Sequence, residues 1–140
     1  MTFFEGIGMH AGYGASMILN GCSISVDKGQ IAVIVGPNGA GKSTAMKALF
    51  GMLPLREGSV FSDGRDITQL RPEQRVLLGM GYVPQTNNVF PSMTVLENLE
   101  MGGFVRSDDL SQTILEIFDL FPILKTKREQ AAGELSGGQR

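Results

Sequence analysis

One stretch, GPNGAGKST at residues 36–44, constrains the fold more than any other part of this sequence. It follows IAVIV (31–35), which is apolar at every position, and it precedes a segment in which apolar residues return at helical spacing. An apolar run without alternation predicts a strand that is buried on both faces, as in a parallel sheet. The order strand, glycine loop, helix is that of a phosphate-binding turn. The sequence therefore predicts an α/β fold built around this turn.

Each residue type in the loop has a chemical reason. The glycines permit backbone angles closed to other residues and leave no side chain between the main chain and a ligand. Backbone N–H groups and the positive end of the next helix dipole can then face phosphate oxygens. Lys42 can reach the terminal phosphates, and Ser43 can ligate the Mg²⁺ that bridges them. We expect nucleotide contacts along the whole loop: Gly36, Pro37, Asn38, Gly39, Ala40, Gly41, Lys42, Ser43 and Thr44.

The flanking residues predict further elements. Apolar residues alternate with serines around Cys22, which indicates a half-buried strand, and DKGQ (27–30) has turn chemistry. Asp63 and Gly64 lie between β-prone pieces and predict a hairpin. After the glycine loop, either of two apolar sets at helical spacing indicates a helix; they are Ala45, Leu49 and Met52, or Met46, Phe50 and Leu53.

A further strand is expected just before Gln85. Pro72 fits the first turn of a short helix that ends near Leu78, and MGYVPQ (80–85) follows as an apolar strand. Residues just beyond the carboxyl ends of strands face the ligand crevice of open α/β sheets, so Gln85 could meet both metal and water. The alternative is an exposed polar loop residue, which is common for glutamine.

The residues after Gln85 favour helices. Thr94 followed by Glu97 matches a capping box and predicts a helix that begins near Val95 and ends at the adjacent Gly102 and Gly103.

Another helix is expected after Ser107 as its cap, with Asp108 and Asp109 in its first turn. The KTKR cluster (125–128) is interpreted as a solvated face. The helix has an apolar face that we expect to pack in the core, with a partner-binding patch as the alternative; it comprises Leu110, Ile114, Ile117, Phe118 and Phe121.

Composition limits the classes of function. With 140 residues and 42% hydrophobic content the chain suits a single domain, and its net charge of −2 argues against binding to nucleic acid or anionic lipid through bulk charge. The lone Cys22 cannot form an internal disulfide, which favours a reducing setting. No uninterrupted apolar run approaches the roughly 20 residues that cross a bilayer.

Three motifs in order, GPNGAGKST, VPQ with Gln85, and LSGGQ (135–139), resemble those of the ATP-binding cassette (ABC) ATPases, and the resemblance covers the whole chain. They correspond to the Walker A motif, the Q-loop and the signature motif. Tyr13, in AGYG, resembles the aromatic residue that stacks on adenine in this family, because every base offers a π face. The alternative is an ordinary turn tyrosine.

More narrowly, AGYG, YVPQTNNVFPSMTVLENLEMGG and AGELSGGQ resemble the ATPase subunits of branched-chain amino-acid importers, to which urea and small-amide importers are closely similar. The resemblance implies a P-loop NTPase fold with an antiparallel β subdomain and a helical subdomain. We expect residues 1–84 to form the nucleotide-binding core with the β subdomain, and residues 85–140 to form the Q-loop and an incomplete helical subdomain.

The resemblance also implies cofactors and partners. ATP and Mg²⁺ would bind, with Lys42 and Gln85 serving catalysis and Ser43 and Gln85 meeting the metal. A second ATPase subunit, identical or not, would close its signature on the same ATP through Ser136, Gly137, Gly138 and Gln139. Transmembrane permease subunits would dock near the Q-loop, a periplasmic or extracellular substrate-binding protein would act indirectly, and no nucleic acid would bind. The protein would be cytoplasmic, peripheral on the inner face of the cell membrane.

Some family motifs have no counterpart in residues 1–140. The family places an apolar strand ending in Asp-Glu and then a switch histidine after the signature, and the single histidine, His10, precedes the glycine loop. We therefore expect a chain truncated after the signature, lacking the C-terminal part of the core, that does not hydrolyse ATP alone. We also expect the 31–35 strand to lose a neighbour.

Two other functions stay open at this point. A soluble ABC ATPase of DNA repair or translation would share the motifs, but the stretch between Gln85 and Leu135 has room only for a compact helical subdomain, without a long coiled coil. A nucleotide-binding switch of another P-loop family is disfavoured by LSGGQ and by the lack of a guanine-specific Asn-Lys-x-Asp segment.

Overall fold

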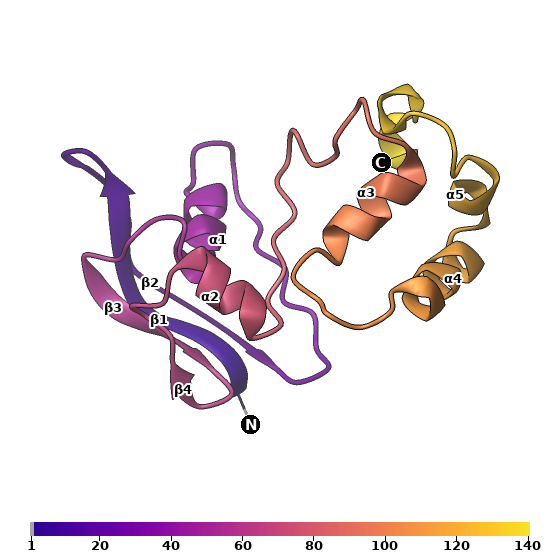
Figure 1. Ribbon diagram of the computed structural model, residues 1–140. Helices are drawn as coiled ribbons and strands as arrows, with labels where there is room; N and C mark the ends of the chain where they lie inside the picture. Colours follow the sequence, from indigo (N-terminus) through magenta and orange to yellow (C-terminus); the bar gives the residue numbers. More distant parts are fainter. Residues whose placement is uncertain (1) are drawn as a thin grey trace. The chain divides into compact units, whose positions relative to one another are not determined.

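The computed structural model describes residues 2–140 and divides the chain into two compact units (Figure 1). The first unit ends at Tyr82 and the second begins at Val83. The first holds a sheet, the glycine loop and two helices, whereas the second is helical. The domain division expected between residues 84 and 85 stays a prediction.

The sheet of the first unit is antiparallel. β1 (Thr2–Tyr13) pairs with β2 (Ser16–Asp27) on one side and with β3 (Glu57–Ser62) on the other, and β4 (Arg65–Asp66) pairs with β3. The strand order is therefore β2-β1-β3-β4. The strand predicted around Cys22 is confirmed as part of β2, and the turn that follows is closed by the Gln30 N–H, which donates to the Asp27 carbonyl at 3.1 Å.

The β3–β4 hairpin turns at the predicted Asp63 and Gly64. Their φ angles are 48° and 74°, in the left-handed region that Asp-Gly pairs adopt most readily in two-residue hairpin loops. Thr68 closes the far side: its N–H donates to Asp66 Oδ1 at 2.8 Å, and its Oγ1 accepts from the Val60 N–H at 2.9 Å. Hydrogen bonds from the side chain and backbone of Thr68 lower the pKa of Asp66.

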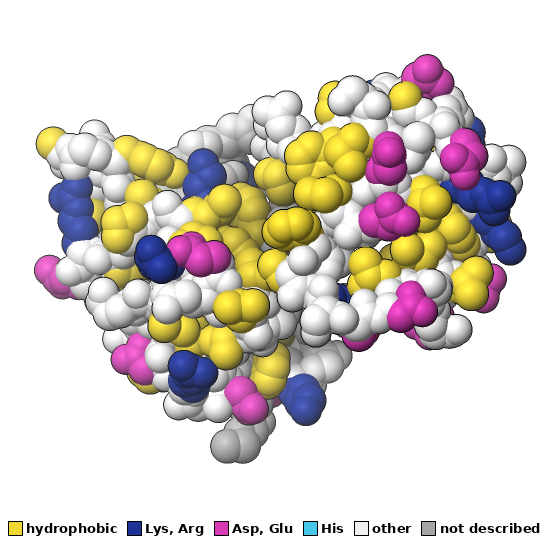
Figure 2. Space-filling view, in the orientation of Figure 1, with side chains coloured by type: hydrophobic (Ala, Val, Ile, Leu, Met, Phe, Trp, Pro, Cys, Tyr) yellow, Lys and Arg dark blue, Asp and Glu magenta, His cyan; other side chains and the backbone are white. Residues whose placement is uncertain are grey.

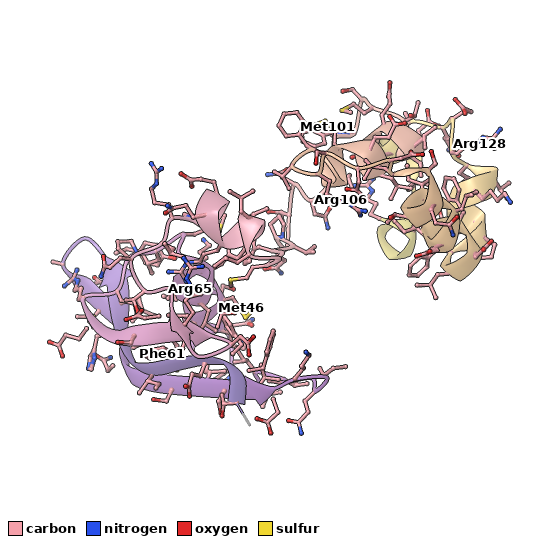
Figure 3. The ribbon with its side chains drawn as sticks, turned by 60° about the horizontal axis from the view of Figure 1, so that its bottom comes forward. Met46, Phe61, Arg65, Met101, Arg106 and Arg128 are labelled. Carbon is pink, nitrogen blue, oxygen red and sulfur yellow. The ribbon has the colours of Figure 1, made fainter. Side chains whose placement is uncertain are left out.

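The predicted helix after the glycine loop is confirmed as α1 (Lys42–Phe50), which packs against the sheet. Met46, labelled in Figure 3, and Met52 are 46% and 51% exposed. The side chains that α1 contributes to the core are those of Ala45, Ala48 and Leu49. The buried cluster consists of Met9, Ala11, Leu19, Ala45, Ala48, Leu49, Val60 and Ile67.

A buried arginine joins α2 (Pro72–Leu77) to α1. Arg75 is 1% exposed, and its guanidinium donates to the carbonyls of Leu49 at 2.7 Å, Leu70 at 2.9 Å and Thr68 at 3.0 Å. Leu49 lies in the last turn of α1, where helix carbonyls lack partners within the helix. Burial lowers the pKa of Arg75, and the three carbonyls keep the cation hydrogen-bonded.

Two apolar segments predicted as strands, residues 31–35 and 80–85, are not strands. Within residues 2–140 neither belongs to the sheet, and Ile31, Val33 and Val35 are 90%, 76% and 83% exposed. Apolar side chains favour burial, but a strand also needs a neighbour that satisfies its N–H and C=O groups. No strand within the described residues supplies that neighbour, so the prediction of a doubly buried parallel strand before the glycine loop is wrong for this structure.

The first helix of the second unit is α3 (Val95–Gly102), whose predicted capping box is confirmed. Glu97 N–H donates to Thr94 Oγ1 at 3.1 Å, and Thr94 N–H donates to Glu97 Oε2 at 2.7 Å. Gly103 ends the helix, as expected. The rest of the unit consists of α4 (Ser111–Leu120), α5 (Pro122–Thr126) and two single turns of 3-10 helix, η1 (Ala132–Glu134) and η2 (Gly137–Gln139).

The start predicted for α4 is wrong, because the helix begins at Ser111 and not after Ser107. Asp109 Oδ1 accepts from the Ser111 N–H at 2.9 Å and from its Oγ at 2.7 Å, which closes a turn before the helix. Asp108 Oδ1 accepts from Arg106 Nε at 2.9 Å. The bonds from Ser111 lower the pKa of Asp109, and the bond from Arg106 lowers the pKa of Asp108.

The apolar face predicted for α4 is packed in part. Phe118 is buried, and Leu110, Ile114 and Ile117 line a cavity of about 270 Å³ together with Arg106, which is labelled in Figure 3. Phe121 lies beyond the helix end and is 51% exposed.

Hydrophobic side chains also lie on the surface of both units (Figure 2). None of the helices in residues 2–140 combines the length and the apolar character that a membrane crossing requires.

Candidate phosphate-binding site

The glycine loop adopts left-handed backbone angles although the segment before it is not a strand. Gly39 and Gly41 have φ angles of 85° and 91°, which residues other than glycine rarely adopt. The Ala40 N–H donates to the Pro37 carbonyl at 3.2 Å, and the Ala45 N–H donates to the Gly41 carbonyl at 2.8 Å as the first helical bond. The loop thus delivers the chain into α1 with the free N–H groups of the helix start at its end.

Contacts with β2 hold the loop in place. A Cβ at Gly41 would lie 3.2 Å from Ile18 Cγ2 and 3.4 Å from Leu19 Cδ2, so the backbone approaches that strand closely. Thr44 is buried below the loop, whereas residues 36–40 and Ser43 are exposed. A cavity of about 150 Å³ separates β2 from the loop. The loop therefore offers an exposed rim on a fixed base.

Lys42 lies across this rim. Its Nζ donates to the carbonyls of Gly36 and Pro37, both at 2.7 Å. The ammonium is therefore placed at the mouth of the loop and is held there by two neutral acceptors. Phosphate oxygens form shorter and stronger charge-assisted bonds with an ammonium than carbonyls do, so a phosphate can replace these partners.

Tyr13 ends β1 in the same unit. It pairs with Ser16 across the turn of the β1–β2 hairpin and is 49% exposed, which leaves part of the ring open to a ligand. Lys47 Nζ, from α1, lies 6.0 Å from the centroid of the ring. No motif in the sequence indicates Lys47, although α1 carries it together with Lys42.

Gln85 belongs to the second unit and is exposed in an irregular segment. Its predicted place at the end of a strand is wrong, because residues 80–85 form no strand. Of the two alternatives, the exposed loop residue describes its surroundings.

The signature segment also lies in the second unit, where backbone pairing fixes its entry. Ala132 N–H donates to the Met93 carbonyl at 2.9 Å, and Gly133 N–H donates to the Pro91 carbonyl at 3.0 Å. Leu135 is buried, whereas Ser136, Gly137 and Gly138 are exposed.

The signature glycines open only a short helix. Ser136 precedes η2, a single 3-10 turn, and the Gln139 Oε1 accepts from the Ser136 N–H at 3.3 Å. Lys127 Nζ donates to the same oxygen at 3.2 Å, so one lysine of the predicted solvated cluster has a partner. Arg140 donates to the Leu135 and Gly133 carbonyls at 3.0 and 2.7 Å and so holds the segment from its far end. No motif in the sequence indicates this role.

The donor set limits how a metal could bind. Within residues 2–140 no three His, Cys, Asp or Glu side chains gather where they could hold a metal ion. A Mg²⁺ ion prefers oxygen ligands and commonly takes few from the protein when a phosphate is present. The exposed Ser43 hydroxyl next to Lys42 fits a metal that arrives with a polyphosphate.

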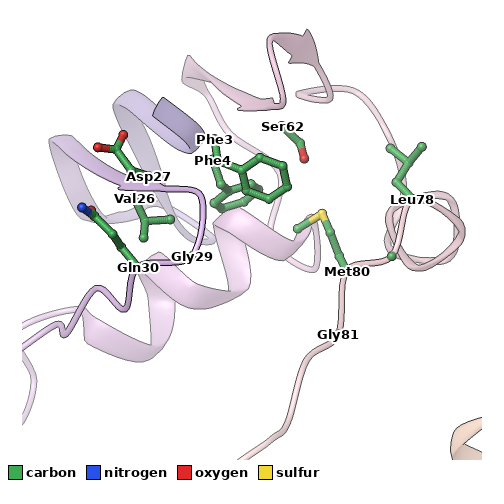
Figure 4. A pocket seen from close by; sticks show the side chains of 11 residues that line it. Phe3, Phe4, Val26, Asp27, Gly29, Gln30, Ser62, Leu78, Met80 and Gly81 are labelled. Carbon is green, nitrogen blue, oxygen red and sulfur yellow. The ribbon is translucent and has the colours of Figure 1, made fainter. Parts of the chain in front are cut away.

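A larger cavity in the first unit has a different character. It measures about 400 Å³, and the side chains of Phe3, Phe4, Val26 and Met80 lie around it (Figure 4). Among the described residues its lining contains no lysine or arginine, so it lacks the cationic side chains that form charge-assisted bonds with a polyphosphate.

Comparison with known proteins places these features in one family. Residues 19–140 match the family model described as ABC transporter. The probable branched-chain amino acid transport ATP-binding protein LivF of Archaeoglobus fulgidus is 41% identical over 133 residues, covering 94% of this chain and 56% of that protein. The high-affinity branched-chain amino acid transport ATP-binding protein BraG of Pseudomonas aeruginosa is 38% identical over 129 residues, covering 91% of this chain and 55% of its own length.

A sugar importer subunit is also similar. The ribose import ATP-binding protein RbsA of Oceanobacillus iheyensis is 32% identical over 139 residues, covering 94% of this chain and 28% of that protein. The chain spans just over half the length of the two amino-acid transport proteins.

Solved structures agree on the fold. A nucleotide-free ATP-binding cassette from an ABC transporter has a TM-score of 0.81 at 33% identity, covering 99% of this chain and 61% of that one. An ATP-binding cassette of an ABC transporter in its ADP conformation has a TM-score of 0.78 at 32% identity, with the same coverage. The glycine loop, the antiparallel sheet beside it and the helical unit with its LSGGQ segment are thus parts of one fold, and the chain belongs to the ABC transporter family.

Proposed function

We propose that this chain is the ATP-binding part of an ABC importer. The observation that carries the proposal is the glycine loop, in which two left-handed glycines shape the main chain and Lys42 Nζ lies over the Gly36 and Pro37 carbonyls. This arrangement joins backbone donors, a helix start and one cation on an exposed rim, which is the chemistry that a polyphosphate needs.

Binding of Mg-ATP would use the loop as follows. Lys42 would exchange its two carbonyl partners for phosphate oxygens, and N–H groups of residues 36–44 would face the same oxygens. Ser43 would offer its hydroxyl to Mg²⁺, which neutralises phosphate charge when bound, and Gln85 would be a further ligand and a catalytic group. Tyr13 would stack on the adenine.

The signature segment would act on a second subunit. Ser136, Gly137 and Gly138 are exposed and would meet the ATP held by the glycine loop of another ATPase subunit, with Gln139 beside them. The partner could be a second copy or a related chain. Transmembrane permease subunits would dock near Gln85, a substrate-binding protein would act indirectly, and the ATPase would lie at the inner face of the membrane.

The transported substrate is proposed from the relatives. Two of the relatives are named for branched-chain amino acid transport and another for ribose import, and the first two are the more similar in sequence. We therefore favour branched-chain amino acids over small amides and sugars. The substrate of such an importer does not touch the ATPase, so no residue here selects it.

Hydrolysis is proposed for the whole transporter ATPase and not for residues 1–140 by themselves. No Asp-Glu pair follows the signature within these residues to hold Mg²⁺ and orient the attacking water. We expect the purified chain to bind Mg-ATP weakly without turnover. Steady ATP hydrolysis by residues 1–140, abolished by Lys42→Ala, would contradict this expectation.

Titration of the purified chain with Mg-ATP, followed by NMR, tests the proposal. Lys42→Ala should weaken binding about ten- to hundredfold, because it removes a charged hydrogen-bond donor to phosphate. Lys28→Ala is the matched control, since it removes the same charge from the turn after β2 and should leave affinity unchanged. If the chain binds no Mg-ATP at millimolar concentration, or if both variants bind equally well, the proposal is wrong.

A further inference from the structure

We propose that Lys47 is a positioning residue for the nucleobase: its ammonium holds one face of the Tyr13 ring, so that the opposite face receives adenine. The inference rests on the proposed function, because it assigns a role within the same nucleotide site. It concerns the base, whereas the glycine loop concerns the phosphates.

The geometry of the pair carries the inference. Lys47 Nζ lies 6.0 Å from the Tyr13 ring centroid, within the reach of a cation–π interaction. Lys47 is partly buried, so its charge is less screened than that of a fully exposed lysine. Tyr13 is 49% exposed, so its ring is covered in part and open in part. A cation over one face of the ring leaves the other face for a second π system.

The same elements hold the ring and the phosphate loop. Tyr13 and Ser16 close the β1–β2 hairpin, and the second strand of that hairpin lies so near the loop that a Cβ at Gly41 would be 3.2 Å from Ile18 Cγ2. α1 carries both Lys42 and Lys47, about 7.5 Å apart along the helix axis at a rise of about 1.5 Å per residue. The helix therefore links the proposed base platform to the proposed phosphate site.

A second cation fixes the turn beside the platform. Arg56 Nη2 donates to the Gly14 carbonyl, and the Arg56 N–H donates to the His10 carbonyl at 2.8 Å. The turn after Tyr13 is thereby tied to the chain just before β3. These two bonds hold the backbone on either side of Tyr13. The cation–π contact therefore acts on the rotation of the Tyr13 side chain.

A ring held in advance loses less conformational entropy when the base stacks on it. Lys47→Met should therefore weaken binding of Mg-ATP about two- to fivefold, which is the fold-change of an exposed to partly buried cation–π contact. The same variant should leave inorganic tripolyphosphate binding unchanged, because tripolyphosphate has no base. Lys47→Arg should retain the wild-type behaviour, since a guanidinium also stacks on aromatic rings.

Selective labelling makes Tyr13 directly visible. The chain contains two tyrosines, Tyr13 and Tyr82, and no tryptophan, so ring labelling gives two sets of NMR signals that Tyr82→Phe assigns. The Tyr13 ring signal should shift on addition of Mg-ATP and not on addition of Mg-tripolyphosphate. In Lys47→Met the signal should also move before any ligand is added, because the variant removes the cation beside the ring.

Lys28→Met is the matched control. Lys28 Nζ lies 6.0 Å from the Phe3 ring near the opposite end of the β1–β2 hairpin, so the variant removes the same charge and the same kind of contact away from Tyr13. It should bind both ligands like the wild type. The Tyr13→Ala/Lys47→Met double variant should bind Mg-ATP no more weakly than Tyr13→Ala alone.

Four outcomes overturn the inference. If Lys47→Met weakens tripolyphosphate as much as Mg-ATP, or if it still weakens Mg-ATP in the Tyr13→Ala background, the ammonium acts on phosphate directly. If Mg-ATP binds without moving the Tyr13 signal, the base does not stack there, and this inference alone fails. If the wild type binds neither ligand, the proposed function fails as well.

Discussion

The antiparallel sheet and the two apolar segments at 31–35 and 80–85 differ in one respect that decides their structure. The sheet strands find partners among themselves, since β1 pairs with both β2 and β3. The apolar segments have more uniformly hydrophobic sequences, yet Ile31 and Val83 are 90% and 81% exposed and neither segment belongs to the sheet. A hydrophobic segment thus favours burial of its side chains, whereas backbone hydrogen bonding decides whether it forms a strand.

The same substitution at two isoleucines tests whether the sheet and the unpaired apolar segment differ in packing. Ile67, in the core, is 0% exposed, and Ile31, in the unpaired segment, is 90% exposed. Ile67→Ala should lower the free energy of unfolding by about 2–5 kcal/mol through lost burial and a cavity. Ile31→Ala should change it by less than about 0.5 kcal/mol.

Urea unfolding followed by circular dichroism measures both values. Equal destabilisation by the two isoleucine variants would show that residues 31–35 are packed in solution, and the contrast between sheet and unpaired segment would then be wrong.

Arg75 tests the same comparison through hydrogen bonds instead of side-chain burial. Arg75→Met should destabilise the chain by about 2–4 kcal/mol, because it leaves the carbonyls of Leu49, Leu70 and Thr68 without their donors. Arg71→Met, one turn away, removes only an exposed ion pair with Glu73 at 3.1 Å and should have almost no effect. A thermal melt of each variant checks this, and matching midpoints would mean that the Arg75 bonds are dispensable.

The smallest expected effect on stability concerns two helix starts in the second unit. Thr94→Ala should lower stability by about 1 kcal/mol, because Thr94 Oγ1 accepts the Glu97 N–H and the capping box is complete. Ser136→Ala should change stability less, since Ser136 precedes only a single 3-10 turn and its backbone bonds with Gln139 survive the substitution. Chemical denaturation distinguishes the two, and a larger loss for Ser136→Ala would indicate that its hydroxyl caps a longer helix than the single turn described.

Local signals predicted local structure well. The Asp63-Gly64 hairpin, the capping box of Thr94 and Glu97, and the helix after the glycine loop are each specified by residues a few positions apart, and all are present. The start of α4 was missed because Asp109 bonds to Ser111 and turns the chain before the helix, a choice between two adjacent acidic residues that spacing does not resolve.

Of the candidate site, the glycine loop and the placement of Lys42 over it follow from the motif, because the glycine angles and the helix start are local properties. Lys47, Arg56 and Arg140 could not be identified in advance. Lys47 lies 34 positions after Tyr13 in the sequence order of this chain, and only packing of α1 beside the β1–β2 hairpin brings its ammonium to the ring.

The sequence by itself determined the glycine loop of this protein and the family to which it belongs, because both follow from short motifs whose residues lie close together along the backbone. Only the tertiary structure decided which apolar segments became strands and which cations met the site. Strand pairing and charge placement depend on groups far apart along the chain, and a hydrogen bond or cation–π contact forms only when folding brings both partners within reach.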